Sequence, residues 1–512
     1  MKPIRLASGF LTVGGWTFAS RILGFVRDIM IAAFLGSGPV AQAFLIAFSL
    51  PNLFRRIFAE GAFNMAFVPM FSKRLEIGDD PEGFLGEAVS ILAAILLGLT
   101  ILATLAMPWL VIAMASGFIG DERFDLAVLY GRIAFPYILF ISLAAVLSGV
   151  LNATGRFAIA AAAPVLLNIL FITAMVAGDA LGWDMGLALS WTVPLAGIAQ
   201  LALIWRAAAL AGFAPRFHWP RLSDDMRRLA VVAAPAALAG GVVQINLLVG
   251  RQVASFFDGA VVWLSFADRL YQLPLGVVGI AIGIVLLPDL SRRLGAGDAA
   301  GGQNALNRAA ELSLALTIPA AVALLVVPGP IVSVLFERGA FTDEDVSPTA
   351  LALAVYALGL PAFVLQKVLQ PLFFAREDTR SPFRYALVAM AVNAAVAIGL
   401  APVLGFVAAA LATTLAAWAM VVLLWLGSRA MGTEAALDQR FLERAPRIVL
   451  SAFAMGLALV AAAWVISDAF TLPGLRYGAL ALLIAVGSAV YFAVGQVIGG
   501  FRMGELRAAL KR

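Results

Sequence analysis

Residues 14–35 read G-G-W-T-F-A-S-R-I-L-G-F-V-R-D-I-M-I-A-A-F-L, which places Arg21, Arg27 and Asp28 inside an otherwise apolar run. The run is long enough for a membrane helix, which needs about 20 mostly apolar residues to cross the hydrocarbon core. Charged side chains within such a helix usually face the interior of a bundle or a watery cavity. The stretch therefore predicts a membrane helix whose charged face points away from lipid.

The same apolar character extends along the whole chain. Of 512 residues, 62% are hydrophobic and 13% are charged, whereas a soluble domain has about 25% charged residues. We predict an all-α polytopic membrane protein with fourteen transmembrane helices. The first is too long for the apolar region of a secretory signal, so we expect it to remain in the mature protein. The predicted spans are residues 11–35, 40–70, 87–115, 127–152, 157–178, 185–206, 229–256, 260–290, 310–336, 347–374, 383–402, 404–427, 446–467 and 474–499.

Basic residues divide unequally between the two sides of these spans. The side that holds the amino terminus and the loops after even-numbered spans has 24 of the 35 Lys and Arg residues. The other side has only Arg123, Arg338 and Arg476. By the positive-inside rule, both termini are predicted to be cytoplasmic. The net charge of +5 follows from this topology, and a nucleic-acid partner is not needed to explain it.

The chain also repeats itself. Residues 69–79, P-M-F-S-K-R-L-E-I-G-D, and residues 288–298, P-D-L-S-R-R-L-G-A-G-D, share Pro, Ser, Arg, Leu, Gly and Asp at an offset of 219. Two six-helix lobes of the same orientation are therefore predicted, related by a pseudo-two-fold axis along the membrane normal, as in transporters that alternate access. The predicted domains are 1–207 (spans one to six), 208–428 (a linker and spans seven to twelve) and 429–512 (spans thirteen and fourteen).

Eight basic residues fall in or near predicted spans, opposed by only three acids. Surplus arginine around a watery cavity suits an anion, because guanidinium binds phosphate oxygens in a fork and keeps its proton. Diphosphate is the natural candidate. The basic residues are Arg21, Arg27, Arg55, Arg56, Arg132, Arg251, Arg269 and Lys367, and the acids are Asp28, Glu60 and Asp268.

Helical geometry separates these charges. Arg21 and Asp28 lie on nearly one face of the first span, with Arg27 about 120° from Arg21. Arg56 and Glu60 are i, i+4 neighbours that can pair. A structural alternative stays open for them and for Asp268 with Arg269, since buried ion pairs also occur between helices without binding anything.

Other residues carry weaker signals. Arg132 is expected to snorkel towards the outer interface, and Arg251 lies near a span end, which leaves its role open. Gln272 follows Asp268 by one helical turn. The chain has no cysteine, no G-x-x-x-x-G-K-[ST] loop and one histidine, His218. These absences predict no disulfide, no nucleotide hydrolysis by that route, no metal and no cofactor.

Four segments resemble a known family. Residues 51–69, P-N-L-F-R-R-I-F-A-E-G-A-F-N-M-A-F-V-P, together with S-R-I-L-G-F-V-R-D at 20–28, are similar to the signature of the MurJ (MviN) family of bacterial lipid II flippases. Residues 267–282, A-D-R-L-Y-Q-L-P-L-G-V-V-G-I-A-I, and 336–341, F-E-R-G-A-F, resemble the family further along the chain. The resemblance covers essentially the full length, including the fourteen predicted spans.

The resemblance implies a fold of the multidrug/oligosaccharidyl-lipid/polysaccharide exporter superfamily, with a final helix pair that forms a groove for a lipid tail. It implies a transporter, not an enzyme, in the bacterial inner membrane. Its substrate would be lipid II, the undecaprenyl-diphosphate-linked precursor of peptidoglycan, moved to the periplasmic leaflet by alternating access. Transport would be driven by membrane potential or an ion gradient. Membrane lipids would be partners, and cell-wall synthesis or division proteins are left open.

The resemblance also assigns residues. The family's required positions match Arg21, Arg27, Asp28, Arg55, Glu60, Arg269 and Lys367. Arg56, Arg251, Asp268, Gln42 and Gln272 are secondary candidates. Some relatives have an acid at the positions of Gln42 and Gln272, so an ion-coupling scheme that needs those carboxylates does not carry over directly.

Rival functions remain. A sodium- or proton-coupled drug exporter would favour carboxylates for cationic substrates and typically has twelve spans. A transporter of another polyprenyl-diphosphate glycan would look alike in physical terms. An enzyme acting on lipid-linked sugar should offer acids or a histidine near an outer loop, and a scaffold for cell-wall machinery would not require buried charges.

Overall fold

The computed structural model describes residues 6–56, 63–472 and 474–501. Within these ranges every regular element is a helix, apart from one isolated bridge between Arg338 and Phe341. The predicted all-α class is confirmed. The helices fall into two compact units: unit 1 holds Met1–Val262 with Arg338–Phe341, and unit 2 holds Trp263–Glu337 with Thr342–Arg512.

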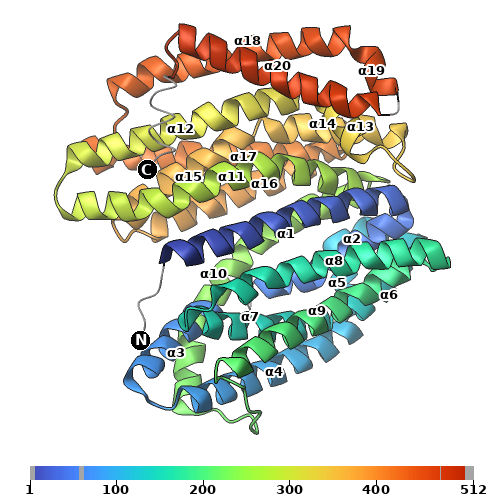
Figure 1. Cartoon of the computed structure of the whole chain (residues 1–512), viewed down its shortest axis with the longest axis vertical. Helices are drawn as coiled ribbons and strands as arrows, with labels where there is room; N and C mark the ends of the chain where they lie inside the picture. The colour runs from blue at the N-terminus through green and yellow to red at the C-terminus, as the bar shows by residue number, and fades with distance from the viewer. Residues whose placement is uncertain (1–5, 57–62, 473, 502–512) are drawn as a thin grey trace. The chain divides into compact units, whose positions relative to one another are not determined.

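Unit 1 contains the helices up to α10 and the start of α11 (Figure 1). The predicted domain boundary after residue 207 falls within this unit, and the division drawn from the sequence repeat stays a prediction. The helices are α1 (Leu6–Leu35), α2 (Pro39–Arg55), α3 (Asn64–Ile77), α4 (Pro81–Leu105), α5 (Met107–Ala115), η2 (Ser116–Phe118), α6 (Glu122–Ala134), α7 (Tyr137–Ala153), α8 (Phe157–Leu181), α9 (Met185–Leu210) and α10 (Asp224–Ala254).

Unit 2 contains most of α11 and all later helices. Its last two long helices, α18 and α20, pack against each other, and α18 also packs on α12 (Figure 1). The helices are α11 (Ala260–Gly295), α12 (Ala299–Val326), α13 (Pro328–Phe336), α14 (Asp343–Ala357), α15 (Leu360–Phe374), α16 (Arg380–Leu404), α17 (Val407–Ser428), η3 (Arg429–Met431), η4 (Thr433–Ala435), α18 (Gln439–Val465), α19 (Ser467–Thr471) and α20 (Leu475–Val497).

Ten helical segments of the described chain are long and apolar enough to cross a membrane. They correspond to predicted spans three to six and nine to fourteen. In their described residues, the other four predicted spans are also helical, as α1, α2 with α3, α10 and α11. These four hold most of the charges that fall within predicted spans. The count of fourteen spans stays a prediction.

Proline marks two helix boundaries within predicted spans. The predicted ninth span is divided at Pro328, where α12 ends and α13 begins, because proline at the start of a helix lacks only a donor that is unsatisfied there anyway. The third predicted span divides similarly at Pro108, the second residue of α5. In each case the proline is the first or second residue of a short apolar helix.

The two copies of the repeated motif adopt similar turns within their own units. Gly78 and Gly297 both have left-handed φ values, 72° and 71°, as glycine allows without a Cβ penalty. Arg74 pairs with Asp79 at 3.6 Å, and Arg293 pairs with Asp298 at 3.4 Å. The local repeat thus has a structural counterpart, whereas the pseudo-two-fold axis stays a prediction.

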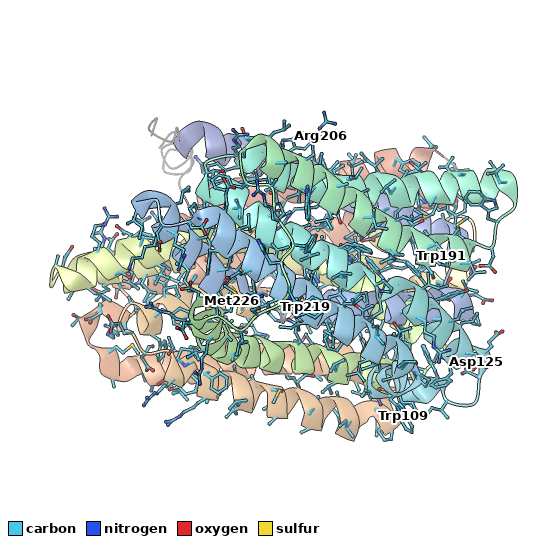
Figure 2. The ribbon with its side chains drawn as sticks, turned by 90° about the horizontal axis from the view of Figure 1, so that it is seen from below. Trp109, Asp125, Trp191, Arg206, Trp219 and Met226 are labelled. Carbon is cyan, nitrogen blue, oxygen red and sulfur yellow. The ribbon has the colours of Figure 1, made fainter. Side chains whose placement is uncertain are left out.

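Unit 1 is built around α8 and α9. Helix α1 packs along α8, α9 packs against α7 and α8, and α2 packs against α6. Trp191 and Trp109 lie towards one end of these helices (Figure 2), and Trp219 lies in the linker that follows α9. All three are exposed, at 57%, 73% and 84%, as expected for aromatic side chains at the two membrane interfaces.

Candidate functional site

Arg27 and Asp28 form a buried ion pair in α1. Their exposed fractions are 8% and 7%. The Arg27 Nε and Nη2 groups both donate to Asp28 Oδ1, at 3.0 Å and 2.7 Å. A charge-assisted fork of this kind is stronger than a neutral hydrogen bond and helps offset the loss of water around both charges. The guanidinium is therefore held by its sequence neighbour.

Helix α8 supplies the remaining partners of Arg27. Its Nη1 donates to Asn168 Oδ1 at 3.0 Å, and Asn168 Nδ2 donates to the Ser20 carbonyl of α1 at 3.0 Å. The guanidinium carbon lies 5.7 Å from the centre of the Phe171 ring, within range of a cation–π interaction. Asn168 thus binds both the side chain and the backbone of α1, and fixes Arg27 between two helices.

Arg21, six residues earlier in α1, is exposed. It makes no ion pair with any residue that the structure describes. The two arginines of the opening stretch consequently differ: Arg27 is buried and bonded, while Arg21 is accessible. Their predicted separation around the helix agrees with this difference, although Asp28 bonds to Arg27 instead of to Arg21.

Arg55 lies at the end of α2 and lines a pocket of about 370 Å³ within unit 1. The pocket also contains Asn64, Ser148, Asn152 and Gln200, from α3, α7 and α9. Asn64 Oδ1 is buried and accepts no hydrogen bond from the described residues. An arginine beside amides and a hydroxyl offers hydrogen bonds to an anionic or polyhydroxylated group.

Gln42 is fully buried near the start of α2, at the opposite end of that helix from Arg55. Its Nε2 donates to Asp258 Oδ1 at 2.8 Å and to the Ser37 carbonyl at 3.0 Å. Its Oε1 accepts from Arg123 Nη1 at 3.1 Å. The amide joins α2, α6 and the turn between α10 and α11 within unit 1. Gln42 is therefore a structural link between these segments. An acid at this position could accept the hydrogen bond from Arg123, but as a carboxylate it could not donate to Asp258 or Ser37.

In unit 2, Asp268, Arg269 and Gln272 lie on α11. Gln272 Nε2 donates to Asp268 Oδ2, so the one-turn spacing of the sequence is used within the helix. Arg269 is exposed. Lys367 is likewise exposed on α15, where its neighbour Gln366 donates to the Ala417 carbonyl at 2.9 Å.

The remaining candidates complete the set. Arg56 caps the end of α2 and is exposed. Arg251 lies in the last turn of α10 and is half-buried. Glu60 lies outside the described residues, so its predicted pairing with Arg56 stays a prediction. Among the described residues, no group of three His, Cys, Asp or Glu side chains is close enough to hold a metal.

Two residues of these networks were not predicted as functional. Asn168 has a sequence signal, since it recurs as Asn393 at an offset of 225, in the repeat of the two halves. Both asparagines are buried, at 4% and 2%. Asp258 had no signal beyond lying in a short loop. Its role depends on a contact with Gln42, 216 residues away.

A family model described as lipid II flippase MurJ matches residues 31–485. A probable lipid II flippase MurJ of Rhizobium tropici is 45% identical, over 99% of this chain and 97% of the relative. The chain belongs to the MurJ family. A lipid II flippase MurJ of Burkholderia cenocepacia is 35% identical over 84% of this chain and 85% of its own.

Solved structures agree with the MurJ assignment. A lipid II flippase MurJ in an inward closed conformation has a TM-score of 0.80 at 25% identity, covering 95% of this chain and 98% of the other. A multidrug resistance transporter of the MATE family, in an inward-facing conformation, has a TM-score of 0.68 at 15% identity, covering 80% and 94%. The second likeness concerns the fold alone.

MurJ family membership confirms the resemblance predicted from the quoted motifs. With the ten apolar helices, it makes the chain a multi-pass protein of the bacterial inner membrane. Proteins of this family are transporters and not catalytic enzymes.

Proposed function

We propose that the chain moves lipid II from the cytoplasmic to the periplasmic leaflet. The observation that carries this proposal is 45% identity, over 99% of the chain, to a relative named as a probable lipid II flippase. Lipid II carries a diphosphate between an undecaprenyl tail and a sugar–peptide headgroup. The arginine surplus of α1, α2 and α11 suits that diphosphate.

The membrane arrangement belongs to the same proposal. Fourteen spans form two six-helix lobes, 1–207 and 208–428, with a pseudo-two-fold axis along the membrane normal and both termini in the cytoplasm. Spans thirteen and fourteen, in 429–512, hold the lipid tail. The excess of Lys and Arg on one side of the predicted spans supports this orientation.

In this mechanism, Arg21, Arg27, Arg55 and Arg269 bind the diphosphate in a central cavity, and Lys367 and Glu60 contribute to the same site. Asp28 is the counter-charge that holds Arg27 while the cavity is empty. The diphosphate then competes with Asp28 for the guanidinium, because both offer charged oxygens. The polar pocket beside Arg55 supplies hydrogen bonds to the headgroup. Exchange of Arg27 between the two anions couples binding to the change of access.

Membrane potential supplies a driving force. An inside-negative potential favours the return of a net-positive empty cavity towards the cytoplasm. The contribution is about 2.3 kcal/mol per charge per 100 mV if the charge crosses the full field. In the loaded protein, the negative charge of the substrate cancels the positive charge of the cavity. The potential therefore acts on the return of the empty protein.

Reconstitution tests the proposal. The purified protein is placed in liposomes with fluorescent lipid II in one leaflet, and an impermeant quencher reports the fraction that crosses. We expect protein-dependent crossing that is faster with an imposed potential. Arg27→Ala protein, at equal incorporation, is the matched control. Crossing that does not exceed that of protein-free liposomes would overturn the function.

The fold likeness to a multidrug exporter supplies one rival, export of cationic drugs. The same liposomes can be loaded with a fluorescent organic cation under a sodium or proton gradient. Export of the cation without movement of lipid II would favour the rival. The other rival, transport of a different polyprenyl-diphosphate glycan, is tested by placing that glycan in the liposomes instead of lipid II.

A further inference from the structure

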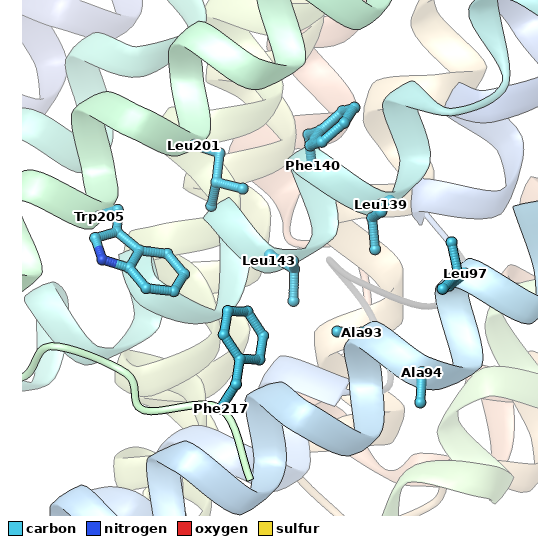
Figure 3. A pocket seen from close by; sticks show the side chains of 9 residues that line it. All are labelled: Ala93, Ala94, Leu97, Leu139, Phe140, Leu143, Leu201, Trp205 and Phe217. Atoms are coloured by element: carbon cyan, nitrogen blue, oxygen red, sulfur yellow. The ribbon is translucent and has the colours of Figure 1, made fainter. Parts of the chain in front are cut away.

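Unit 1 has a second pocket that the proposed function does not use. Its volume is about 390 Å³, within the range of about 300–1,000 Å³ for small-molecule sites. Figure 3 shows the side chains of α4, α7, α9 and the following linker that line it. The described lining consists only of alanine, leucine and aromatic side chains, among them Leu97, Leu139, Leu201, Trp205 and Phe217.

This pocket lies on a different face of α7 from the polar pocket of Arg55. Leu139, Phe140 and Leu143 line the apolar pocket, whereas Ile141, Ala144 and Ser148 line the polar one. The two sets occupy distinct stripes of the same helix, at helical spacing. A ligand of the apolar pocket would therefore leave the Arg55 pocket unoccupied.

Exposed apolar side chains surround the apolar pocket. Leu97 of the lining is 52% exposed, and its neighbour Ile95 in α4 is 57% exposed. Leu203 of α9 is 38% exposed. In a membrane protein such surfaces face lipid tails. The pocket is thus accessible to the hydrocarbon of the bilayer.

The linker between α9 and α10 closes one end of the pocket and is fixed in place. The ring centres of Phe217 and Trp205 are 5.7 Å apart. The His218 backbone N–H donates to Ser90 Oγ at 2.8 Å, and Ser223 Oγ donates to Glu87 Oε2 at 2.7 Å. A Cβ at Gly86 would lie 2.7 Å from the Arg216 carbonyl oxygen, so only glycine lets the linker approach α4 this closely.

Two arginines adjoin the aromatic side chains of this rim in the sequence, and Glu87 of α4 is held by Ser223. Arg206 follows Trp205 and Arg216 precedes Phe217, and both side chains are exposed. Arg206 lies one turn before the end of α9 and is labelled at the upper edge of the view in Figure 2. Residues 185–223 contain no aspartate or glutamate. Two exposed arginines, one beside Trp205 and one beside Phe217 in the sequence, match the phosphate of a lipid whose hydrocarbon chain enters the pocket.

We propose that this pocket is a binding site for an anionic membrane phospholipid. One acyl chain occupies the apolar space between α4, α7 and α9, and the headgroup phosphate binds Arg206 and Arg216. The bound lipid fills the wall of unit 1 behind the polar pocket. The site differs from the tail groove proposed for α18 and α20, which lie in unit 2.

Photocrosslinking of the full-length protein in vesicles tests the site. The vesicles are phosphatidylcholine with a trace of phosphatidylglycerol that carries a diazirine on an acyl chain, or of phosphatidylcholine with the same label. We expect the labelled phosphatidylglycerol to modify peptides of α4, α7 and α9 that line the pocket. Removing each arginine, as in Arg206→Gln and Arg216→Gln, should lower this labelling about fivefold.

A matched pair of substitutions separates the pocket from general lipid contact. Ala94→Trp fills the pocket from α4, whereas Ile95→Trp adds the same ring at the adjacent exposed position outside the lining. Ala93→Phe is a second filling variant if Ala94→Trp does not fold. Labelling lost with a filling variant and kept with Ile95→Trp supports the site. Labelling unchanged by filling overturns it, and equal labelling by the two lipids overturns the anionic headgroup.

Discussion

Arg27 and Asp28 are joined by two hydrogen bonds to one carboxylate oxygen, although they are adjacent in the same helix and both are buried. Adjacent residues of a helix point about 100° apart, so this contact requires the long arginine side chain to fold back. Asn168 then completes the arrangement at Nη1. The pair is a structural ion pair in this conformation, and the proposed transport role requires Arg27 to exchange partners.

Asp28→Asn should tighten binding of lipid II and slow its transport. The change frees the guanidinium from a charged partner, and a hydrogen bond to a charged group contributes about 1.5–3 kcal/mol. We expect the Kd for lipid II to fall about tenfold, because about 1.4 kcal/mol corresponds to that factor. Binding to purified protein and liposome transport are measured on the same sample. Weaker binding would show that Asp28 belongs to the substrate site itself.

Arg27→Ala should abolish complementation of a flippase-depleted strain at normal expression. Arg27→Lys keeps the charge but offers a single ammonium in place of the fork, so we expect partial growth at most. Membrane levels of each variant are compared by immunoblot. Full growth with Arg27→Ala would remove Arg27 from the proposed site.

Asn168→Ala should destabilise unit 1. It leaves Arg27 Nη1 without its amide acceptor and the Ser20 carbonyl without its side-chain donor. An unsatisfied buried group costs about 1–3 kcal/mol. Thermal unfolding in detergent measures the loss, with Asn152→Ala as the control because Asn152 is exposed. An equal effect of both substitutions would contradict the role of Asn168.

The helices could be predicted from sequence because membrane crossing imposes a long apolar run and leaves little freedom. The ten segments of predicted spans three to six and nine to fourteen show this. The breaks at Pro108 and Pro328 were missed, since an uninterrupted apolar run continues across each proline. Hydropathy is averaged over a window of residues, whereas a helix break depends on the missing backbone N–H of a single proline.

The candidate site was predictable only as a set of charges. Helical spacing predicted the angular positions of Arg21, Arg27 and Asp28 around α1, but it could not predict which side chains they contact. Asn168 lies 141 residues from Arg27, and Asp258 lies 216 residues from Gln42. Such contacts depend on how helices pack, and no local pattern encodes them. The repeated asparagine was the one signal that pointed to Asn168.

The stability of unit 1 should depend on the charge of Asp121 at low pH. Asp121 caps α6 and accepts from the Arg123 backbone N–H at 2.8 Å and from Arg123 Nε at 2.8 Å. The hydrogen bonds of the Arg123 side chain lower the pKa of the Asp121 carboxyl, against an opposing effect of burial. A lowered pKa in the folded state stabilises the fold above the unfolded pKa of about 3.9. That stabilisation is lost as the pH falls through the folded value.

Thermal unfolding of the wild type and Asp121→Asn in detergent, from neutral pH to below about pH 4, measures this contribution. We expect the wild type to be more stable at neutral pH and the difference to vanish in acid. Asp125→Asn is the control, since Asp125 also lies in the first turn of α6 and is exposed. A difference for Asp121→Asn that stays constant with pH would contradict the prediction.

Gly36→Ala should impair unit 1 at the end of α1. Gly36 has a left-handed φ of 61°, which costs a residue with a Cβ about 1–2 kcal/mol. The added methyl would also overlap the Ala340 carbonyl oxygen, in a loop whose Ala340 N–H donates to the Ala33 carbonyl at 2.7 Å. We expect a lower Tm in detergent and reduced complementation. Gly98→Ala in α4 is the matched control, because a Cβ there meets open space and alanine favours a helix. A Tm for Gly36→Ala equal to that of the control would show that the 338–341 loop can move away from α1 without cost.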